Sequence, residues 1–213
     1  MSNQDALRAE KLRQLDALLK QATAVEAELA SMESGPTPQF TKFYTAYYAT
    51  TGFLLGLFGA ISSLLFNVVG GLAVEGDSMK LIRIYLTFPM GKQALEMSDK
   101  THEPILLAVG CCLYIATGMA LGVLFQLVLA KFARDRGFIT RCLWSCGLGV
   151  LVWLVAFYGI LSWLQPLLFG GNWIVEMTPW YVGLATHLVY AITHAAVFPL
   201  GVYTPYRLDT ENT

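Results

Sequence analysis

Residues 142–175 read CLWSCGLGVLVWLVAFYGILSWLQPLLFGGNWIV and contain no Asp, Glu, Lys or Arg. A helix of about 20 apolar residues crosses the hydrocarbon core of a membrane, which is about 30 Å thick. A soluble helix carries charged residues on its exposed face every turn or two, and this stretch has none. This stretch therefore predicts a helix that is surrounded by lipid.

Three further stretches lack charged residues in the same way, namely 51–74, 104–130 and 177–206. The chain of 213 residues is accordingly 55% hydrophobic and 14% charged, whereas soluble proteins carry about 25% charged residues. We therefore expect an all-α integral membrane bundle of four transmembrane helices in a domain at 45–207, followed by a polar tail at 208–213. The expected spans are 45–74, 104–131, 142–169 and 179–203.

An amphipathic helix that resembles a short coiled coil is expected ahead of the membrane domain, over residues 1–35. Apolar side chains recur there at alternating spacings of three and four residues, which predicts one apolar face. The late part of the helix is acidic, which favours contact with a protein over contact with anionic lipid. A linker with proline and aromatic residues follows at 36–44. The apolar face of the helix, which we call the interaction seam, consists of Leu15, Leu18, Ala22, Val25, Leu29 and Met32.

The link between the first two spans, 75–103, is too apolar for a free loop. We expect an interfacial segment that lies on the membrane or against a partner and is broken at Pro89 and Gly91. A short strand remains an alternative, because periodicity over so few residues does not separate the two structures.

The basic residues predict how the chain is oriented in the membrane. Residues 131–141 between the second and third spans are rich in Lys and Arg, whereas 170–178 contain neither. The positive-inside rule then places both termini in the cytoplasm, with the chain in the cytoplasmic (inner) membrane. The link 75–103 argues in the opposite direction, because it also carries basic residues, namely Lys80, Arg83, Lys92 and Lys100.

Two pairs of glycines are spaced four residues apart within the spans. A small residue at every fourth position lets transmembrane helices approach closely. We expect helix packing at Gly52, Gly56, Gly118 and Gly122. The cysteines, Cys111, Cys112, Cys142 and Cys146, lack metal-site spacing and are expected to pack as small apolar residues.

Polar residues inside a membrane are costly, so each one raises a functional question. The intramembrane polar residues are Asn67, Gln126, Gln165, His187 and His194. Asn and Gln more often join helices by hydrogen bonds than line a pathway. The two histidines are seven residues apart, on one helix face and about 10 Å apart along the axis. They are the candidates for cofactor binding, although interhelical hydrogen bonding is the more frequent role of such residues.

A haem held by histidines from two different spans is not expected, because the remaining histidine, His102, lies in the link 75–103. We predict no cofactor, while a haem or quinone contact is left open. No catalytic residue and no metal site is expected, since all four predicted spans lack carboxylates. Nucleic acid is not expected as a partner, because the sequence has no large basic patch.

The expected function is that of a non-catalytic accessory or scaffold subunit in a larger membrane complex, of bioenergetic type by analogy. Its partners would be lipid and other subunits, contacted through the N-terminal helix and the link 75–103. One alternative is a small oligomeric channel or carrier with a polar path along Asn67, Gln126, His187 and His194. A third is a redox subunit that contributes a histidine ligand or a quinone contact.

Overall fold

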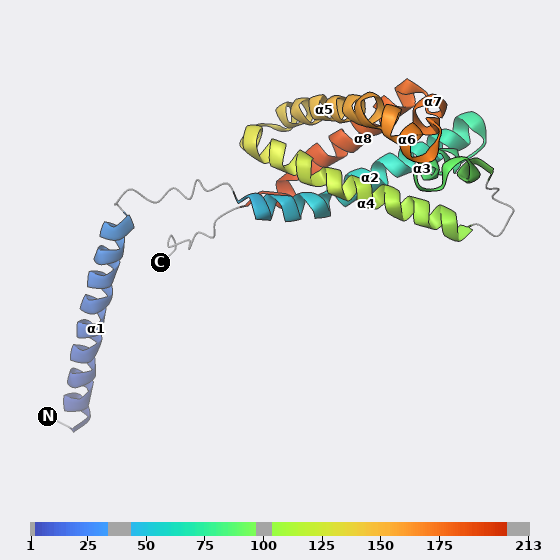
Figure 1. The fold of residues 1–213 in the computed structure, drawn as a ribbon. Helices are drawn as coiled ribbons and strands as arrows, with labels where there is room; N and C mark the ends of the chain where they lie inside the picture. The colour runs from blue at the N-terminus through green and yellow to red at the C-terminus, as the bar shows by residue number, and fades with distance from the viewer. Residues whose placement is uncertain (1–2, 34–43, 97–103, 204–213) are drawn as a thin grey trace. The chain divides into compact units, whose positions relative to one another are not determined.

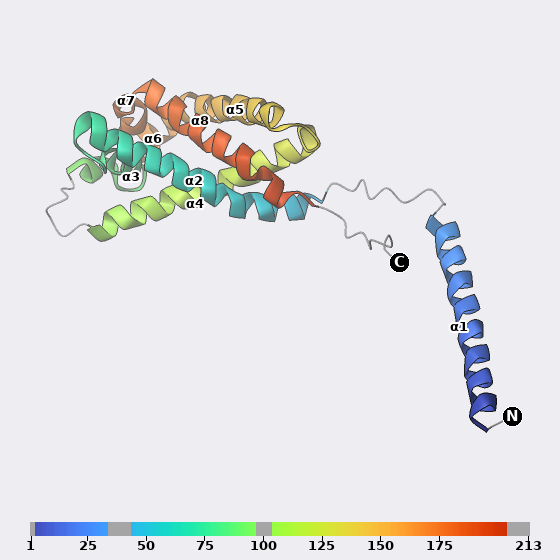
Figure 2. The same cartoon turned by 180° about the vertical axis from the view of Figure 1, so that it is seen from behind.

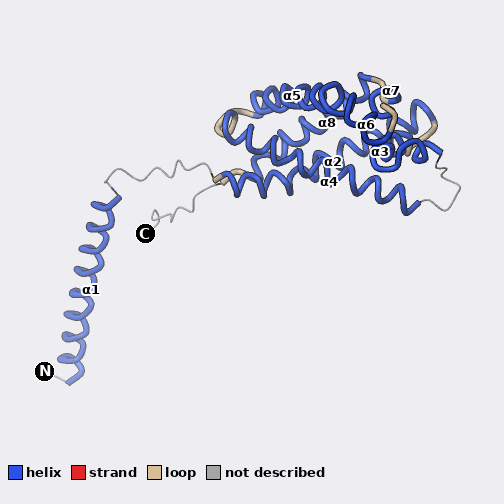
Figure 3. The backbone as a smooth tube through the Cα atoms, in the orientation of Figure 1, coloured by secondary structure: helices blue, strands red, loops and turns tan. Residues whose placement is uncertain are grey.

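The computed structural model describes residues 3–33, 44–96 and 104–203. The described residues are almost entirely helical and include no strand (Figure 3). Within these ranges, 4 helices are long and apolar enough to cross a membrane. The predicted all-helical class is thereby confirmed for these residues, as is the presence of four helices long and apolar enough to span a membrane.

The candidate spans cover Thr45–Val74, Pro104–Phe132, Phe138–Phe169 and Trp180–Gly201. The first two are single α-helices, α2 (Thr45–Glu75) and α4 (Pro104–Phe132). The third is divided into α5 (Phe138–Leu154), the π-helical segment η2 (Val155–Leu161) and α6 (Ser162–Phe169). The fourth is α8 (Trp180–Val197), which continues as the 3-10 turn η3 (Phe198–Gly201).

Two span boundaries differ from the prediction for identifiable reasons. The third span begins at Phe138 rather than at residue 142, so the helix includes Arg141. An arginine is tolerated at the end of a span, where its stem lies along apolar surface and its head reaches outward. The Arg141 guanidinium lies 5.8 Å from the centre of the Phe198 ring. The α-helical part of the fourth span ends at Val197, since Pro199 lies in the 3-10 turn that follows.

Helix α8 lies between α2 and α5, as both ribbon views show (Figures 1 and 2). It is joined to α5 by the Ser145 hydroxyl, which donates to the Ala191 carbonyl at 2.7 Å. It is joined to α4 by the Tyr190 hydroxyl, which donates to the Gly118 carbonyl at 2.7 Å. The spans are therefore connected by buried hydrogen bonds between side chains and backbone as well as by apolar packing.

Helices α2 and α4 pack with their backbones in contact where the four predicted packing glycines lie. A Cβ atom on Gly122 would lie 2.2 Å from the Gly52 carbonyl oxygen and 2.6 Å from the Gly56 Cα atom. A Cβ atom on Gly118 would lie 2.5 Å from the Ala60 Cβ atom. No side chain larger than hydrogen fits at these positions unless the helices move apart.

The link between the first two spans folds into α3 (Lys80–Met90) and the 3-10 helix η1 (Gly91–Glu96). The alternative of a strand is therefore wrong for these residues. The apolar side chains of the link turn inward, and Ile82, Ile84 and Leu86 are each 2% exposed. They pack on the spans and on α7 (Trp173–Met177). The apolar side chains of the link, for which we expected contact with the membrane or a partner, are thus buried against other helices of the same chain. Residues 97–103 lie outside the described ranges.

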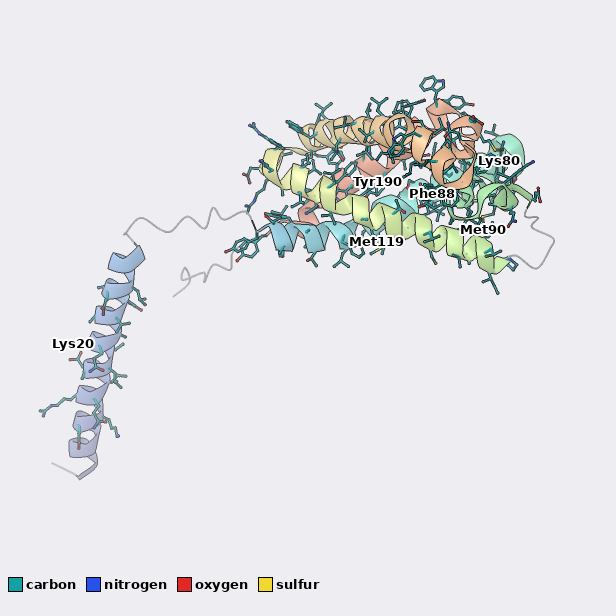
Figure 4. All side chains as sticks on the ribbon, in the orientation of Figure 1. Lys20, Lys80, Phe88, Met90, Met119 and Tyr190 are labelled. Carbon is teal, nitrogen blue, oxygen red and sulfur yellow. The ribbon has the colours of Figure 1, made fainter. Side chains whose placement is uncertain are left out.

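Helix α1 (Asn3–Glu33) belongs to a separate unit, 1–43, and we describe it by itself. Its apolar side chains from Leu12 to Leu29 are exposed, between 54% and 62% for the leucines and Val25. Figure 4 labels Lys20 on this helix, and Lys20 forms an ion pair with Asp16 at 3.2 Å. The Met32 side chain and most of the predicted linker lie outside the described residues, and the amphipathic contact stays a prediction.

Candidate functional site

A cavity of about 560 Å³ lies within the transmembrane unit. Its walls come from α2, α3, α4, α5, η2, α7 and α8, and they are largely apolar and aromatic. Phe88 and Tyr190, both labelled in Figure 4, belong to the walls together with Phe125 and Phe157. The volume falls within the range of about 300–1,000 Å³ that is typical of small-molecule sites.

The cavity opens sideways, on the surface of the spans. Leu113 on α4 and Ile160 on η2 both line it, yet they are 41% and 43% exposed. These residues belong to candidate spans, whose exposed surface would face lipid in a membrane. In Figure 1, α4 and α5 meet at the turn 133–137, and α2 and α8 are seen between them. The mouth of the cavity therefore includes exposed residues of two candidate spans.

The π-helical segment η2 forms one wall of the cavity. It contributes Ala156, Phe157, Ile160 and Leu161 to the lining. π-helical turns are rare and are frequently found at functional sites. This segment therefore marks the same place as the cavity through an independent feature of the backbone.

A directed chain of hydrogen bonds lines one side of the cavity. Thr186 Oγ1 donates to Asn67 Oδ1 at 2.7 Å, and Asn67 Nδ2 donates to the Tyr114 hydroxyl at 3.3 Å. The Tyr114 hydroxyl donates to Ser63 Oγ at 3.0 Å, and Ser63 Oγ donates to the Ala60 carbonyl at 3.0 Å. Such a chain satisfies polar groups where the dielectric constant is low, and its bonds strengthen one another. It also joins α8, α2 and α4.

His187 lines the same cavity with one ring nitrogen already bonded. Its Nδ1 atom lies 2.8 Å from the Gly183 carbonyl oxygen. A carbonyl oxygen only accepts, so Nδ1 carries the hydrogen and the neutral ring presents a lone pair at Nε2. Within the described part of the chain, Nε2 makes no hydrogen bond. The ring of Phe157 stands edge to face with the imidazole, with centres 6.1 Å apart.

Gln126 and His194 lie apart from this cavity, and neither lines it. Both side chains are 0% exposed. Nε2 of His194 lies 3.2 Å from Gln126 Oε1, and Gln126 Nε2 donates to the Gly201 carbonyl at 3.2 Å. The four residues of the predicted polar path therefore fall in two places, Asn67 and His187 at the cavity and Gln126 and His194 between packed helices.

Gln165 joins the link to the spans at a third place. Its Nε2 atom donates to Thr87 Oγ1 at 2.9 Å, and its Oε1 atom accepts from the Ile174 amide at 3.1 Å. The side chain is 0% exposed. One residue of α6 thus holds both α3 and α7, which form part of the cavity wall through Ile84 and Ile174.

The described residues contain no group of three or more His, Cys, Asp and Glu that could hold a metal ion. The two histidines predicted as cofactor candidates do not meet, since His187 lines the cavity and His194 is bonded to Gln126. His102 lies outside the described residues. Hence His187 is the member of this pair that a bound molecule could reach.

Several residues of the cavity were not singled out by sequence reasoning. Tyr114 and Ser63 carry ordinary residue types for a membrane helix, and Tyr85 belongs to a link expected at the surface. One available signal was that Ser63 and Asn67 lie four residues apart, on one face of α2. In comparisons with known proteins, no protein-family model, curated protein or solved structure matches the chain.

Proposed function

We propose that this protein binds a lipid-soluble molecule within the membrane, in the cavity between α4 and η2. The observation that carries the proposal is the sideways opening of an apolar cavity at exposed residues of two candidate spans. The unbonded Nε2 atom of His187 supplies a polar contact inside. We propose a binding role rather than catalysis.

A photoreactive lipid analogue tests this function in the full-length protein reconstituted in nanodiscs. A long-chain alcohol with a diazirine near its middle should label residues of the cavity, such as Leu121 and Ile160. Ala156→Phe should lower this labelling several-fold, because the larger side chain fills part of the cavity. Val155→Phe is the matched control, since Val155 is 48% exposed and does not line the cavity.

The labelled positions are read by peptide mass spectrometry. Labelling spread evenly over exposed residues of all spans, with no difference between the two variants, would contradict the proposed binding function. Saturation of cavity labelling by an excess of unlabelled alcohol is the additional result that a specific site requires.

A second candidate function is that of an accessory subunit held by α1. The observation that favours it is the exposed set of apolar residues on this helix, at Leu12, Leu15, Leu18, Leu19, Val25 and Leu29. A helix of this kind gains stability by burying its apolar face against another chain. The partner would then be a coiled-coil-forming helix of another membrane subunit. The channel alternative also stays a prediction, although its four polar residues fall in two places.

Purification in mild detergent with mass spectrometry of co-purifying chains tests this second candidate. Leu18→Asp should remove a specific partner by placing a charge on the apolar face, whereas Lys20→Asp should retain it. A monodisperse protein without a partner, for both variants and for the unmodified chain, would count against the accessory role.

We further propose that both termini face the cytoplasm, in an inner membrane. The start of α2, the turn after α4 and the end of η3 share one end of the unit. There, Arg134 Nη2 donates to the Tyr203 carbonyl at 2.8 Å, and the rings of Tyr44 and Tyr203 are 5.0 Å apart. This end carries Lys131, Arg134, Arg136 and Arg141, which supports a cytoplasmic position. A C-terminal green fluorescent protein fusion should accordingly fluoresce, and a C-terminal alkaline phosphatase fusion should be inactive.

A further inference from the structure

We infer that the molecule bound in the cavity is a neutral, apolar compound that carries a hydroxyl group, and that Nε2 of His187 accepts the hydrogen of that hydroxyl. This inference rests on the proposed binding function and specifies the chemistry of its ligand. It follows from three features of the walls, namely the tautomer of His187, the polar chain whose hydroxyl groups are bonded within the protein, and the absence of charged lining residues.

The tautomer of His187 determines which polar group fits. Nδ1 donates to the Gly183 carbonyl, so Nε2 of the neutral ring is an acceptor. An imidazolium ion would be costly at this depth in a membrane, which favours the neutral ring. An acceptor enclosed by apolar walls is best matched by a ligand that donates a hydrogen bond. A ketone, an ether or an ester brings acceptors alone and leaves Nε2 unmatched.

The remaining polar groups on that side of the cavity are mostly occupied by one another. The hydroxyl hydrogens of Tyr114 and Ser63 are used within the chain that ends at the Ala60 carbonyl. That of Thr186 has two acceptors within the protein, Asn67 Oδ1 at 2.7 Å and the Val182 carbonyl at 2.8 Å. Beside Tyr114, whose ring centre lies 5.6 Å from that of Tyr85, the hydroxyls of Tyr85 and Thr117 are 2.6 Å apart and bonded to each other. His187 is thus the wall group with the strongest unused capacity to accept a hydrogen bond.

The cavity also excludes charged headgroups. None of the residues that line it is Asp, Glu, Lys or Arg. A phosphate or a carboxylate moved into such an apolar site without a charged partner would lose its hydration with no compensation. The ligand is therefore neutral, and the headgroup of an ordinary phospholipid does not fit.

The depth of His187 supports the same conclusion. The fourth span begins at Trp180, so His187 lies about 10 Å along the helix axis from that end. A hydroxyl that reaches Nε2 therefore lies within the hydrocarbon region rather than at the headgroup level. This position suits a molecule that is apolar throughout except for its hydroxyl.

Two sources share this chemistry, an aliphatic alcohol and a phenol or quinol. The probes are 4-dodecylphenol and hexadecanol, each paired with its methyl ether, which keeps the shape but cannot donate. Each probe competes with the diazirine-bearing alcohol in nanodiscs containing the full-length protein. We expect the hydroxyl compound of at least one pair to compete about three- to tenfold more strongly than its ether, the usual range for one hydrogen bond. The pair with the larger ratio identifies the source.

Variants of the wall assign the effect to His187. His187→Leu should bring the ratio of hydroxyl to ether close to one while leaving the ether's own competition unchanged. His187→Gln should retain part of the preference, because its amide oxygen can accept a hydrogen bond. Thr178→Val is the matched control, since Thr178 lines the same cavity and its hydroxyl makes no hydrogen bond within the described residues. This control should leave the ratio as it is in the unmodified protein.

The outcomes separate this inference from the function on which it rests. Equal competition by hydroxyl and ether in the unmodified protein overturns the inference, while the binding function stands if both compete and Ala156→Phe weakens both. Failure of every probe to compete overturns both. If His187→Leu fails to fold, as judged by gel filtration, the inference is tested by the ratio of hydroxyl to ether competition in the unmodified protein and in His187→Gln. A ratio abolished by Thr178→Val and kept in His187→Leu would also contradict the inference.

Discussion

At the scale of single residues, two histidines on one helix have different surroundings. Both were expected on one face of the fourth span, from their spacing of seven residues. His187 bonds to the backbone of its own helix and lines the cavity, whereas His194 is 0% exposed and bonded to Gln126. The sequence identifies such residues by their polarity. Which of them is accessible depends on how far the neighbouring helices lie from α8 at each level.

The glycines of the α2–α4 contact give a prediction at this scale. Gly122→Ala should lower the stability of the protein by about 1–3 kcal/mol, the usual cost of overpacking, because its Cβ would lie 2.2 Å from the Gly52 carbonyl. Gly70→Ala is the control in α2, where an added Cβ meets nothing within 4 Å. It should leave stability unchanged or raise it slightly, since alanine favours a helix.

Thermal unfolding in detergent, followed by circular dichroism, measures both glycine variants. Equal midpoints for the two variants would show that α2 and α4 do not approach as closely as described.

At the scale of elements, the four spans follow from uncharged stretches, because the cost of charge in lipid leaves a strong pattern in the sequence. Their finer structure leaves no such pattern. The π-helical segment at Val155–Leu161 consists of apolar and aromatic residues, as does most of the α-helix before it. The inward packing of α3 was also unpredictable, since an apolar segment can bury itself against lipid, a partner or its own chain. The burial of Ile82, Ile84 and Leu86 identifies the last of these.

The bonds of Gln165 give a prediction at the scale of elements. Gln165→Leu removes the hydrogen bond to Thr87 Oγ1 and the one from the Ile174 amide. The Ile174 amide then lacks this partner, whereas the Thr87 hydroxyl still donates to the Ile84 carbonyl. Loss of about 1.4 kcal/mol of local stability corresponds to about tenfold faster opening. Amides of α3 should therefore exchange about tenfold faster in hydrogen–deuterium exchange, while those of α8 should be unaffected.

Trp163→Phe is the control for this measurement. Its ring is 56% exposed, and its Nε1 bond goes to the Gly159 carbonyl within the same span. It should leave exchange in α3 unchanged. Unaltered exchange of α3 in Gln165→Leu would mean that apolar packing alone holds this helix.

At the scale of the whole molecule, the cavity is lined by residues of α2, α3, α4, α5, η2, α7 and α8, which are distant from one another in the sequence. No local pattern encodes this arrangement, so the sequence could give candidate polar residues but not the space between them. Asn67 and His187 were identified because amides and imidazoles are rare in spans. Their neighbours Ser63, Tyr114 and Thr186 were not, because hydroxyl-bearing residues are common there.

The central claim is that this cavity opens into the bilayer, and the most direct test is the accessibility of a nitroxide spin label at its mouth. The label is attached at Thr117→Cys, in a chain whose four native cysteines are replaced by alanine. Thr117 lines the cavity and is exposed on α4. Reference labels are placed at the lipid-facing Leu143, which is 69% exposed, and at Arg136 in the turn after α4.

We expect the label at Thr117 to collide frequently with molecular oxygen and rarely with a water-soluble nickel chelate, as the label at Leu143 does. Oxygen concentrates in the hydrocarbon region, whereas the chelate stays in water. Frequent collision with the nickel chelate, as expected at Arg136, would show that the cavity is filled with water and would contradict the proposed entry of a ligand from the membrane.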